Sequence, residues 1–186
     1  MKENDFSGIA PSSTDRLHLR RPTREDHRAV YLVHSNPLTN LFNPHGPDDL
    51  VSSERMLIDW ISHWETYGYG YWAVSFKETL EQVIGFGGLA RKKVGDRFGL
   101  NLYFRFAPDA WGKGLATEIA TEALSFAFTV LGESEVLAKV RANNLPSRRV
   151  LERFGMSIVG ECEDVPNAAP SLIYAASMTE RERRKP

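Results

Sequence analysis

The sequence predicts a single α/β domain with one central mixed sheet flanked by helices. Its 186 residues suit one domain with a sizeable core. Strand-like segments alternate with segments whose apolar residues recur at helical spacing. The clearest strand spans 99–106, where Leu100, Leu102, Phe104 and Phe106 occupy one face.

The N-terminal part is expected to begin with a strand at 17–20. A helix should follow from Thr23 to about Ser35, because Thr23 and Asp26 resemble a capping box. The stretch 36–49 contains three prolines, and we expect a loop there.

A second helix should begin with Ser52 or Ser53 as its cap, and residues 67–70 should then turn the chain. The apolar face of this helix consists of Met56, Leu57, Trp60, Ile61 and Trp64. Besides 99–106, the later strands are expected at 71–76, 82–90, 135–141, 157–163 and 171–177. Two further helices are expected, one ending near Phe128 and one from Pro146 to Phe154. The buried stripe of the first consists of Ala116, Ile119, Ala120, Ala123, Leu124, Ala127 and Leu131.

Composition describes an ordinary globular protein, with 42% hydrophobic and 25% charged residues and a net charge of −1. This charge provides no global field to attract nucleic acid or a membrane surface, so neither is expected as a partner. Apolar runs long enough for a bilayer and a signal-peptide core are both missing from the sequence. The single cysteine, Cys162, fits a reducing cytoplasm, and its acidic neighbours Glu161 and Glu163 argue against a nucleophilic thiolate.

Three regions are expected along the chain. Residues 1–15 are polar and should form a flexible arm, 16–178 should form the domain, and 179–186 should form a charged, solvated tail.

Residues 110–118 join the 99–106 strand to the next helix. Gly112 and Gly114 leave backbone N–H groups uncovered at a helix entrance, where the helix dipole favours negative charge. This arrangement predicts a site for the pyrophosphate of a nucleotide-bearing cofactor.

Two common glycine signatures do not fit this stretch. A P-loop requires Ser or Thr after Gly-Lys, but Gly114 follows Lys113, and Ala107 stands five residues before Gly112. A dinucleotide fingerprint requires a third glycine where Thr117 stands.

A third pattern does fit. Residues 111–116, the glycine loop, resemble the Arg/Gln-x-x-Gly-x-Gly/Ala loop of the GCN5-related N-acetyltransferases (GNAT). Residues 143–156 are similar to the family's Asn-x-x-Ser/Ala-x-x-x-Leu/Tyr-Glu-Lys-x-Gly-Phe segment. Residues 70–74 and 84–89 are similar to its second and third strands, and the resemblance covers about 17–178.

Trp111 departs from the Arg/Gln position and is typical of the branch that resembles the ribosomal-protein N-terminal acetyltransferases. The resemblance implies transfer of the acetyl group of acetyl-CoA to a primary amine of a peptide, a protein N-terminus or a small molecule. It also implies a mostly antiparallel sheet, whose fourth and fifth strands splay apart to admit the cofactor.

The resemblance further implies which residues hold acetyl-CoA. Backbone N–H groups from about Gly112 to Thr117 would bind the pyrophosphate, and the pantetheine arm would run beside the end of the fourth strand. The expected cofactor-binding residues are Phe104, Arg105, Phe106, Trp111, Gly112, Lys113, Gly114, Leu115, Ala116, Thr117, Asn144 and Ser147. For Lys113, a phosphate contact and a solvated position at the loop tip are both open.

The resemblance is incomplete at the positions of the general base and the general acid. Asn101 stands where many members carry a glutamate base, and Leu151 stands where many carry a tyrosine acid. Ser147 is the remaining hydroxyl by motif position and is expected to stabilise the thiolate, unless it only bonds the backbone at a helix start. Tyr103 could order water together with Asn101. The expected catalytic residues are therefore Ser147, Asn101 and Tyr103.

The base itself stays open. A water chain ordered by Asn101 and Tyr103, a loop carboxylate such as Glu161 or Glu163, and bulk solvent are the alternatives. An α-amine has a pKa near ~8 and a lysine near ~10.4, so a missing base favours an acceptor amine of low pKa.

The acceptor pocket is expected between the first two helices, their loop and the last strands. Its candidate residues are Phe42, His45, Trp72 and Tyr174, whereas Trp60 and Trp64 on the helix stripe are expected to be core. The histidines show no metal-ligand spacing, so no metal site is expected.

Two other functions stay open. An amino-sugar or antibiotic acetyltransferase would need an acidic pocket, for which the 36–49 loop provides only Asp48 and Asp49. A non-catalytic CoA-binding regulatory module is compatible with Asn101 and Leu151. The chain is expected to be a monomer or a homodimer.

Overall fold

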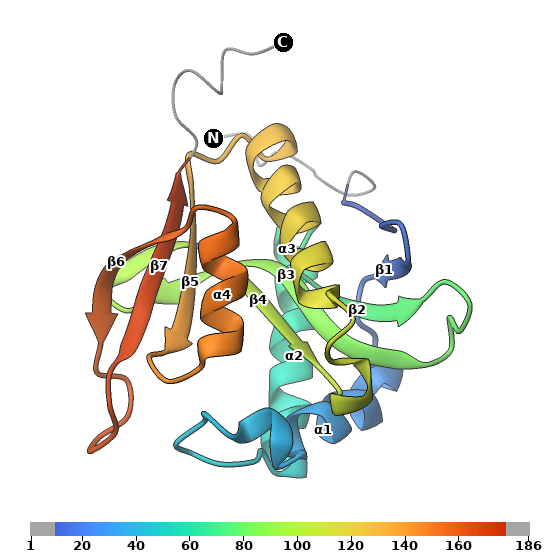
Figure 1. Ribbon diagram of the computed structural model, residues 1–186. Coiled ribbons are helices and arrows are strands. Elements are labelled where there is room, and N and C mark those ends of the chain that lie inside the picture. The colour runs from blue at the N-terminus through green and yellow to red at the C-terminus, as the bar shows by residue number, and fades with distance from the viewer. Residues whose placement is uncertain (1–9, 178–186) are drawn as a thin grey trace.

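The computed structural model describes residues 10–177 of the chain. Seven strands form one sheet in the order β1-β2-β3-β4-β5-β7-β6, with helices packed against it (Figure 1). The strands are β1 (Leu17–Arg20), β2 (Tyr71–Phe76), β3 (Val83–Val94), β4 (Arg97–Phe106), β5 (Glu135–Arg141), β6 (Ser157–Cys162) and β7 (Ser171–Ser177). The α-helices are α1 (His27–Ser35), α2 (Leu50–Tyr67), α3 (Leu115–Ser125) and α4 (Leu145–Arg153). The expected α/β class with one central sheet is confirmed.

The sheet is antiparallel except at one junction. Strands β4 and β5 are parallel and pair only at Leu100 with Val136 and at Asn101 with Leu137. Beyond Asn101 the two strands diverge, and α4 lies beside β5 (Figure 1). The expected splay between the fourth and fifth strands is therefore confirmed.

The two faces of the sheet carry separate apolar clusters. The larger one joins α3 and α4 to the face that carries Trp72 and Leu102. The smaller one joins α1 and α2 to Tyr71 and Phe86 on the opposite face. Because successive strand residues point to opposite faces, neighbours such as Tyr71 and Trp72 belong to different halves of the molecule.

The start of α2 differs from the prediction. The cap is Asp49, whose carboxylate accepts the Ser52 N–H at 2.7 Å, rather than Ser52 or Ser53. Leu50 and Val51 in the first turn are exposed, so the apolar pattern alone does not mark where the helix begins.

The β3–β4 hairpin is longer than predicted. Val94 pairs with Arg97 around a turn in which Gly95 has φ 61°, a conformation that glycine adopts without strain. The third helix is shorter than predicted, because α3 ends at Ser125 and the chain continues as a π-helical turn over Phe126–Val130.

The predicted terminal segments lie largely outside the described residues, which exclude 1–9 and 178–186. In the described part of the arm, the Leu19 N–H donates to the Ser12 carbonyl at 2.9 Å, so this segment lies against β1. Between residues 10 and 177, no helix is long and apolar enough to cross a membrane.

One buried polar side chain connects α1 to the sheet. His34 is 2% exposed, and its Nδ1 lies 2.8 Å from the Val30 carbonyl, which can only accept a hydrogen bond. Nδ1 therefore carries the proton, and Nε2 accepts the O–H of Tyr103 at 2.7 Å. Burial, helped by the charge of Arg105, lowers the pKa of His34 to about 3. The histidine is neutral in the folded protein.

This burial makes stability depend on pH. The unfolded chain binds a proton at His34 below about pH 6.5, whereas the folded chain does not until about pH 3. The contribution of His34 is thus complete above pH ~6.5 and is lost as the pH falls toward 3. We expect the free energy of unfolding, measured with urea, to fall between pH 7 and 5 by about 2 kcal/mol more in the wild type than in His34→Gln.

His27→Gln serves as the matched control, because His27 is exposed at the start of the same helix. Its pH dependence should parallel that of the wild type. Parallel curves for His34→Gln and the wild type would contradict a neutral, buried His34.

Candidate active site

The glycine loop lies between the end of β4 and the start of α3. Gly112 and Gly114 have φ values of 73° and 76°, in the left-handed region that side chains rarely adopt. A Cβ added at Gly112 would meet nothing within 4 Å, and one at Gly114 would meet only Arg16 Nη2 at 3.9 Å. The backbone of the loop is therefore open to a ligand.

The first turn of α3 has no side-chain cap, since Gly114 occupies the cap position. Uncapped N–H groups at a helix N-terminus carry partial positive charge and bind anions. The loop and the helix entrance together form an arrangement that suits a phosphate group.

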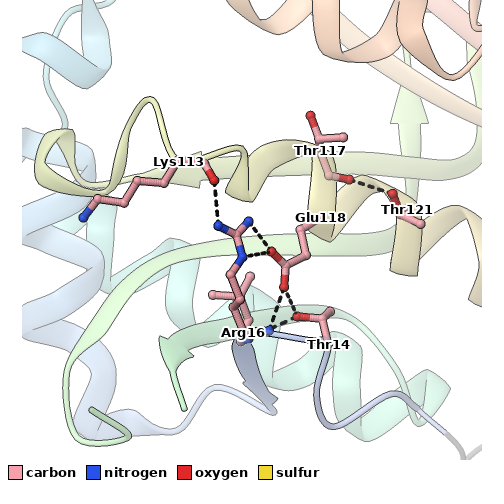
Figure 2. Close-up of polar contacts among 7 residues, drawn as sticks. Thr14, Arg16, Lys113, Thr117, Glu118 and Thr121 are labelled. Carbon is pink, nitrogen blue, oxygen red and sulfur yellow. Dashed lines mark hydrogen bonds and ion pairs between the residues drawn. The ribbon is translucent and has the colours of Figure 1, made fainter. Parts of the chain in front are cut away.

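The two long side chains of the loop, Trp111 and Lys113, have partners other than the helix entrance. The Trp111 Nε1–H donates to the Phe106 carbonyl at 2.8 Å. Lys113 extends away from α3, with Nζ 5.4 Å from the centre of the Phe76 ring (Figure 2). In this structure the Lys113 ammonium contacts an aromatic ring rather than the helix entrance.

The end of β4 provides an open strand edge beside the loop. Phe104, Arg105 and Phe106 pair with β3, but they lie beyond the last pair between β4 and β5. Their other edge is unpaired in the sheet, and an extended, peptide-like ligand binds such an edge by main-chain hydrogen bonds.

Helix α4 begins near the splay with two residues of the predicted site. The Asn144 side-chain oxygen accepts the Ser147 N–H at 3.2 Å and caps the helix. Pro146 occupies the first turn, where a missing N–H costs nothing. Within residues 10–177, the Ser147 hydroxyl and the Asn144 amide nitrogen make no hydrogen bond.

Opposite the glycine loop, a polar cluster lies between β4 and the first helices. The Asn101 Nδ2 donates to the Tyr71 hydroxyl at 2.7 Å, and the Tyr103 hydroxyl donates to His34. Burial raises the pKa of both phenols, that of Tyr103 to about 12. Both are therefore neutral, and the Tyr103 oxygen keeps a lone pair to accept a further hydrogen bond.

The 36–49 loop adds one carboxylate near this cluster. The Asp48 N–H donates to the His34 carbonyl at 3.1 Å, and Arg105 Nη1 donates to the Asn40 side chain at 3.2 Å. Burial raises the pKa of Asp48, although the positive charge of Arg105 opposes the shift. A half-buried carboxylate with a raised pKa is a better base than an exposed aspartate.

The predicted acceptor residues do not gather at one place. Phe42 and His45 lie on the 36–49 loop, His45 exposed, whereas Trp72 is buried in the cluster under α3. Tyr174 belongs to that same cluster and donates to Glu152 at 2.7 Å. Glu161 is exposed at the end of the edge strand β6.

Sequence reasoning missed His34 and Tyr71. A usable signal existed for His34, since it continues the buried stripe of α1 at Val30 and Val33. Among the described residues, no three His, Cys, Asp or Glu side chains gather in a way that could hold a metal ion.

Comparisons with known proteins agree with this geometry. A family model described as an acetyltransferase (GNAT) domain matches residues 16–157. The uncharacterized N-acetyltransferase YoaA of Bacillus subtilis strain 168 is 30% identical over 156 residues, which are 79% of this chain and 82% of the relative.

Two solved structures share the fold. An acetyltransferase from Agrobacterium tumefaciens superposes with a TM-score of 0.75 at 23% identity, covering 96% of this chain and 100% of that chain. RimJ of Mycobacterium smegmatis gives a TM-score of 0.66 at 19% identity, covering 87% and 81%. The family match includes both the glycine loop and the start of α4. The chain belongs to the GNAT family and is an acetyl-CoA-dependent acetyltransferase.

Proposed function

We propose that this protein moves the acetyl group of acetyl-CoA to an α-amine of a peptide or protein in the cytoplasm. The observation that carries the proposal is the juxtaposition of an open glycine loop, an uncapped helix entrance and an unpaired edge of β4. The solved RimJ relative is a complex with CoA-disulfide, which supports the choice of cofactor.

In this proposal the N–H groups of residues 112–117 bind the pyrophosphate. The pantetheine arm adds to the edge of β4 at 104–106 as an extra strand would. Asn144, whose oxygen is used as the α4 cap, donates to the arm through its amide nitrogen. The thioester then lies in the splay, between the polar cluster and Ser147.

The reaction joins the acceptor nitrogen to the acetyl carbon and breaks the carbon–sulfur bond. The Ser147 hydroxyl donates a hydrogen bond to the departing thiolate. Asn101 and Tyr103 orient the amine from the opposite side, and Asp48 receives its proton through water. Because Asp48 is a weak base, the acceptor enters mostly as the neutral amine, which favours an α-amine with a pKa near ~8.

Charge on the acceptor side also bears on the substrate. The positive charge of Arg105 acts to lower the pKa of both Asp48 and His34. Polycationic acceptors such as aminoglycosides require several carboxylates, and this face places an arginine beside its carboxylate. A peptide amine needs no such acidic pocket.

An acceptor panel tests the proposal. CoA release from acetyl-CoA should be fastest with N-terminal peptides and slower with polyamines and aminoglycosides. Faster turnover of aminoglycosides would favour the antibiotic alternative, and the absence of acetyl-CoA binding in calorimetry would overturn the proposed cofactor site.

Charge at the helix entrance provides a second test. Thr117→Glu places a carboxylate in the first turn of α3, where it stabilises a helix by about 0.3–1 kcal/mol but repels a pyrophosphate. We expect the Kd for acetyl-CoA to rise by about 100-fold, as for a like-charge contact of several kcal/mol. Calorimetry measures this change.

Thr121→Glu is the matched control, because Thr121 lies one turn further along α3 and is exposed. It should bind acetyl-CoA nearly as tightly as the wild type. Equal affinity of Thr117→Glu and Thr121→Glu for acetyl-CoA would show that the helix entrance is not part of the cofactor site.

The acceptor side is tested separately by Tyr103→Phe, which keeps the ring and removes the hydroxyl. With the best acceptor of the panel, kcat should fall by about 100-fold, a usual effect when a group that orients the reacting amine is lost. The Kd for acetyl-CoA should stay within twofold of the wild-type value.

Tyr67→Phe controls for loss of a phenol elsewhere, since Tyr67 packs against His63 on α2. It should keep wild-type turnover. If Tyr103→Phe did so as well, the polar cluster would have no part in the reaction.

A further inference from the structure

A second group of hydrogen-bonded side chains, Thr14, Arg16 and Glu118, connects the glycine loop to the residues just before β1. Glu118, in the first turn of α3, is held by Thr14 and Arg16 (Figure 2). The Arg16 backbone N–H donates to Glu118 Oε1 at 3.1 Å, and the Thr14 hydroxyl donates to the same oxygen. Arg16 Nε and Nη2 donate to Oε2 at 2.8 and 2.5 Å.

Arg16 also reaches the glycine loop itself. Its Nη1 donates to the Lys113 carbonyl at 2.9 Å. One guanidinium therefore binds both the loop backbone and a carboxylate of the helix that follows (Figure 2).

The contact to Lys113 sets the direction of a backbone donor. The Lys113 carbonyl and the Gly114 N–H belong to one planar peptide group, and in a trans peptide they point in opposite directions. No cis peptide occurs among the described residues. By holding the carbonyl, Arg16 turns the Gly114 N–H away from itself and keeps a carbonyl oxygen away from the anion.

The contact between Arg16 and Glu118 sets the net charge near the entrance of α3. Burial raises the pKa of Glu118, but the hydrogen bonds from Thr14 and Arg16 outweigh it and hold the pKa below its usual range. The carboxylate is therefore ionised within one turn of the helix entrance, where it would repel a pyrophosphate. The positive charge of Arg16 offsets it at contact distance.

We propose that Arg16 is a positioning residue for the cofactor pyrophosphate. It fixes the peptide group between Lys113 and Gly114 and neutralises Glu118, so that residues 112–117 present N–H groups without a competing negative charge. This inference rests on the proposed cofactor site, but it assigns a role to the residue just before β1, far from the glycine loop in the sequence.

The test measures the Kd of acetyl-CoA for Arg16→Gln by calorimetry. We expect this Kd to rise by about ten- to hundredfold, as for the loss of one charge-assisted hydrogen bond. Arg21→Gln is the matched control, because Arg21 follows β1 and forms a comparable exposed ion pair with Glu65 of α2. Its Kd should remain within twofold of the wild-type value.

Two further measurements separate positioning from a general loosening of the fold. S-acetylpantetheine carries the thioester and the arm but no pyrophosphate, so its Kd, measured by competition with acetyl-CoA, should be the same for Arg16→Gln and the wild type. Adding Glu118→Gln to Arg16→Gln should restore part of the lost acetyl-CoA affinity, because the uncompensated carboxylate is then removed.

Each contrary result has a distinct meaning. Unchanged acetyl-CoA affinity in Arg16→Gln, or equal weakening of both ligands, would overturn the role of Arg16 while leaving the cofactor site in place. A wild-type chain that does not bind acetyl-CoA would overturn the proposed function, and this inference with it.

Discussion

The site depends on the early end of hydrogen bonding between β4 and β5. Only two residue pairs join these strands, at Leu100 and Asn101 of β4. Backbone groups of a central strand need partners. Beyond Asn101, β4 is paired within the sheet on the β3 side alone, and the Phe106 carbonyl accepts the Trp111 indole N–H. The open edge lies next to the glycine loop at one end and near the start of α4 across the splay. Cofactor binding in the proposed function completes the hydrogen bonding that the sheet leaves open.

In the proposed function, one face of the sheet supports the cofactor site and the other supports the acceptor site. The face under α3 and α4 carries the larger apolar cluster, which fixes the helix entrance and the Asn144 cap. The opposite face buries neutral His34, Tyr71 and Tyr103 in hydrogen bonds that hold the polar cluster in place. Asn101 and Tyr103 lie on β4 at the splay, so one strand connects the cofactor side to the acceptor side.

The sequence was most informative where function rests on local backbone geometry. The uncovered backbone at Gly112 and Gly114 and the place of Pro146 in the first turn of α4 depend on residues close together in the chain, and both were expected from the sequence. The cap at Asn144 was not predicted. The α/β class and the splay were also anticipated, the latter through family resemblance. The Asp49 cap was missed because an exposed Leu50 and Val51 interrupt the amphipathic pattern. The separation of Trp72 and Tyr174 from the 36–49 loop could not be predicted, because it depends on strand order and on which face each side chain takes.

The most direct test of the account follows backbone amides by NMR while acetyl-CoA is added to the wild-type chain. We expect the largest chemical-shift changes to fall on residues 112–117 and on 104–106, because these segments would meet the pyrophosphate and the arm. Smaller changes should follow at the amides of Asn144, Leu145 and Ser147. Changes concentrated on β6 and β7, with residues 112–117 unaffected, would contradict the central claim that the glycine loop and the open edge of β4 hold the cofactor.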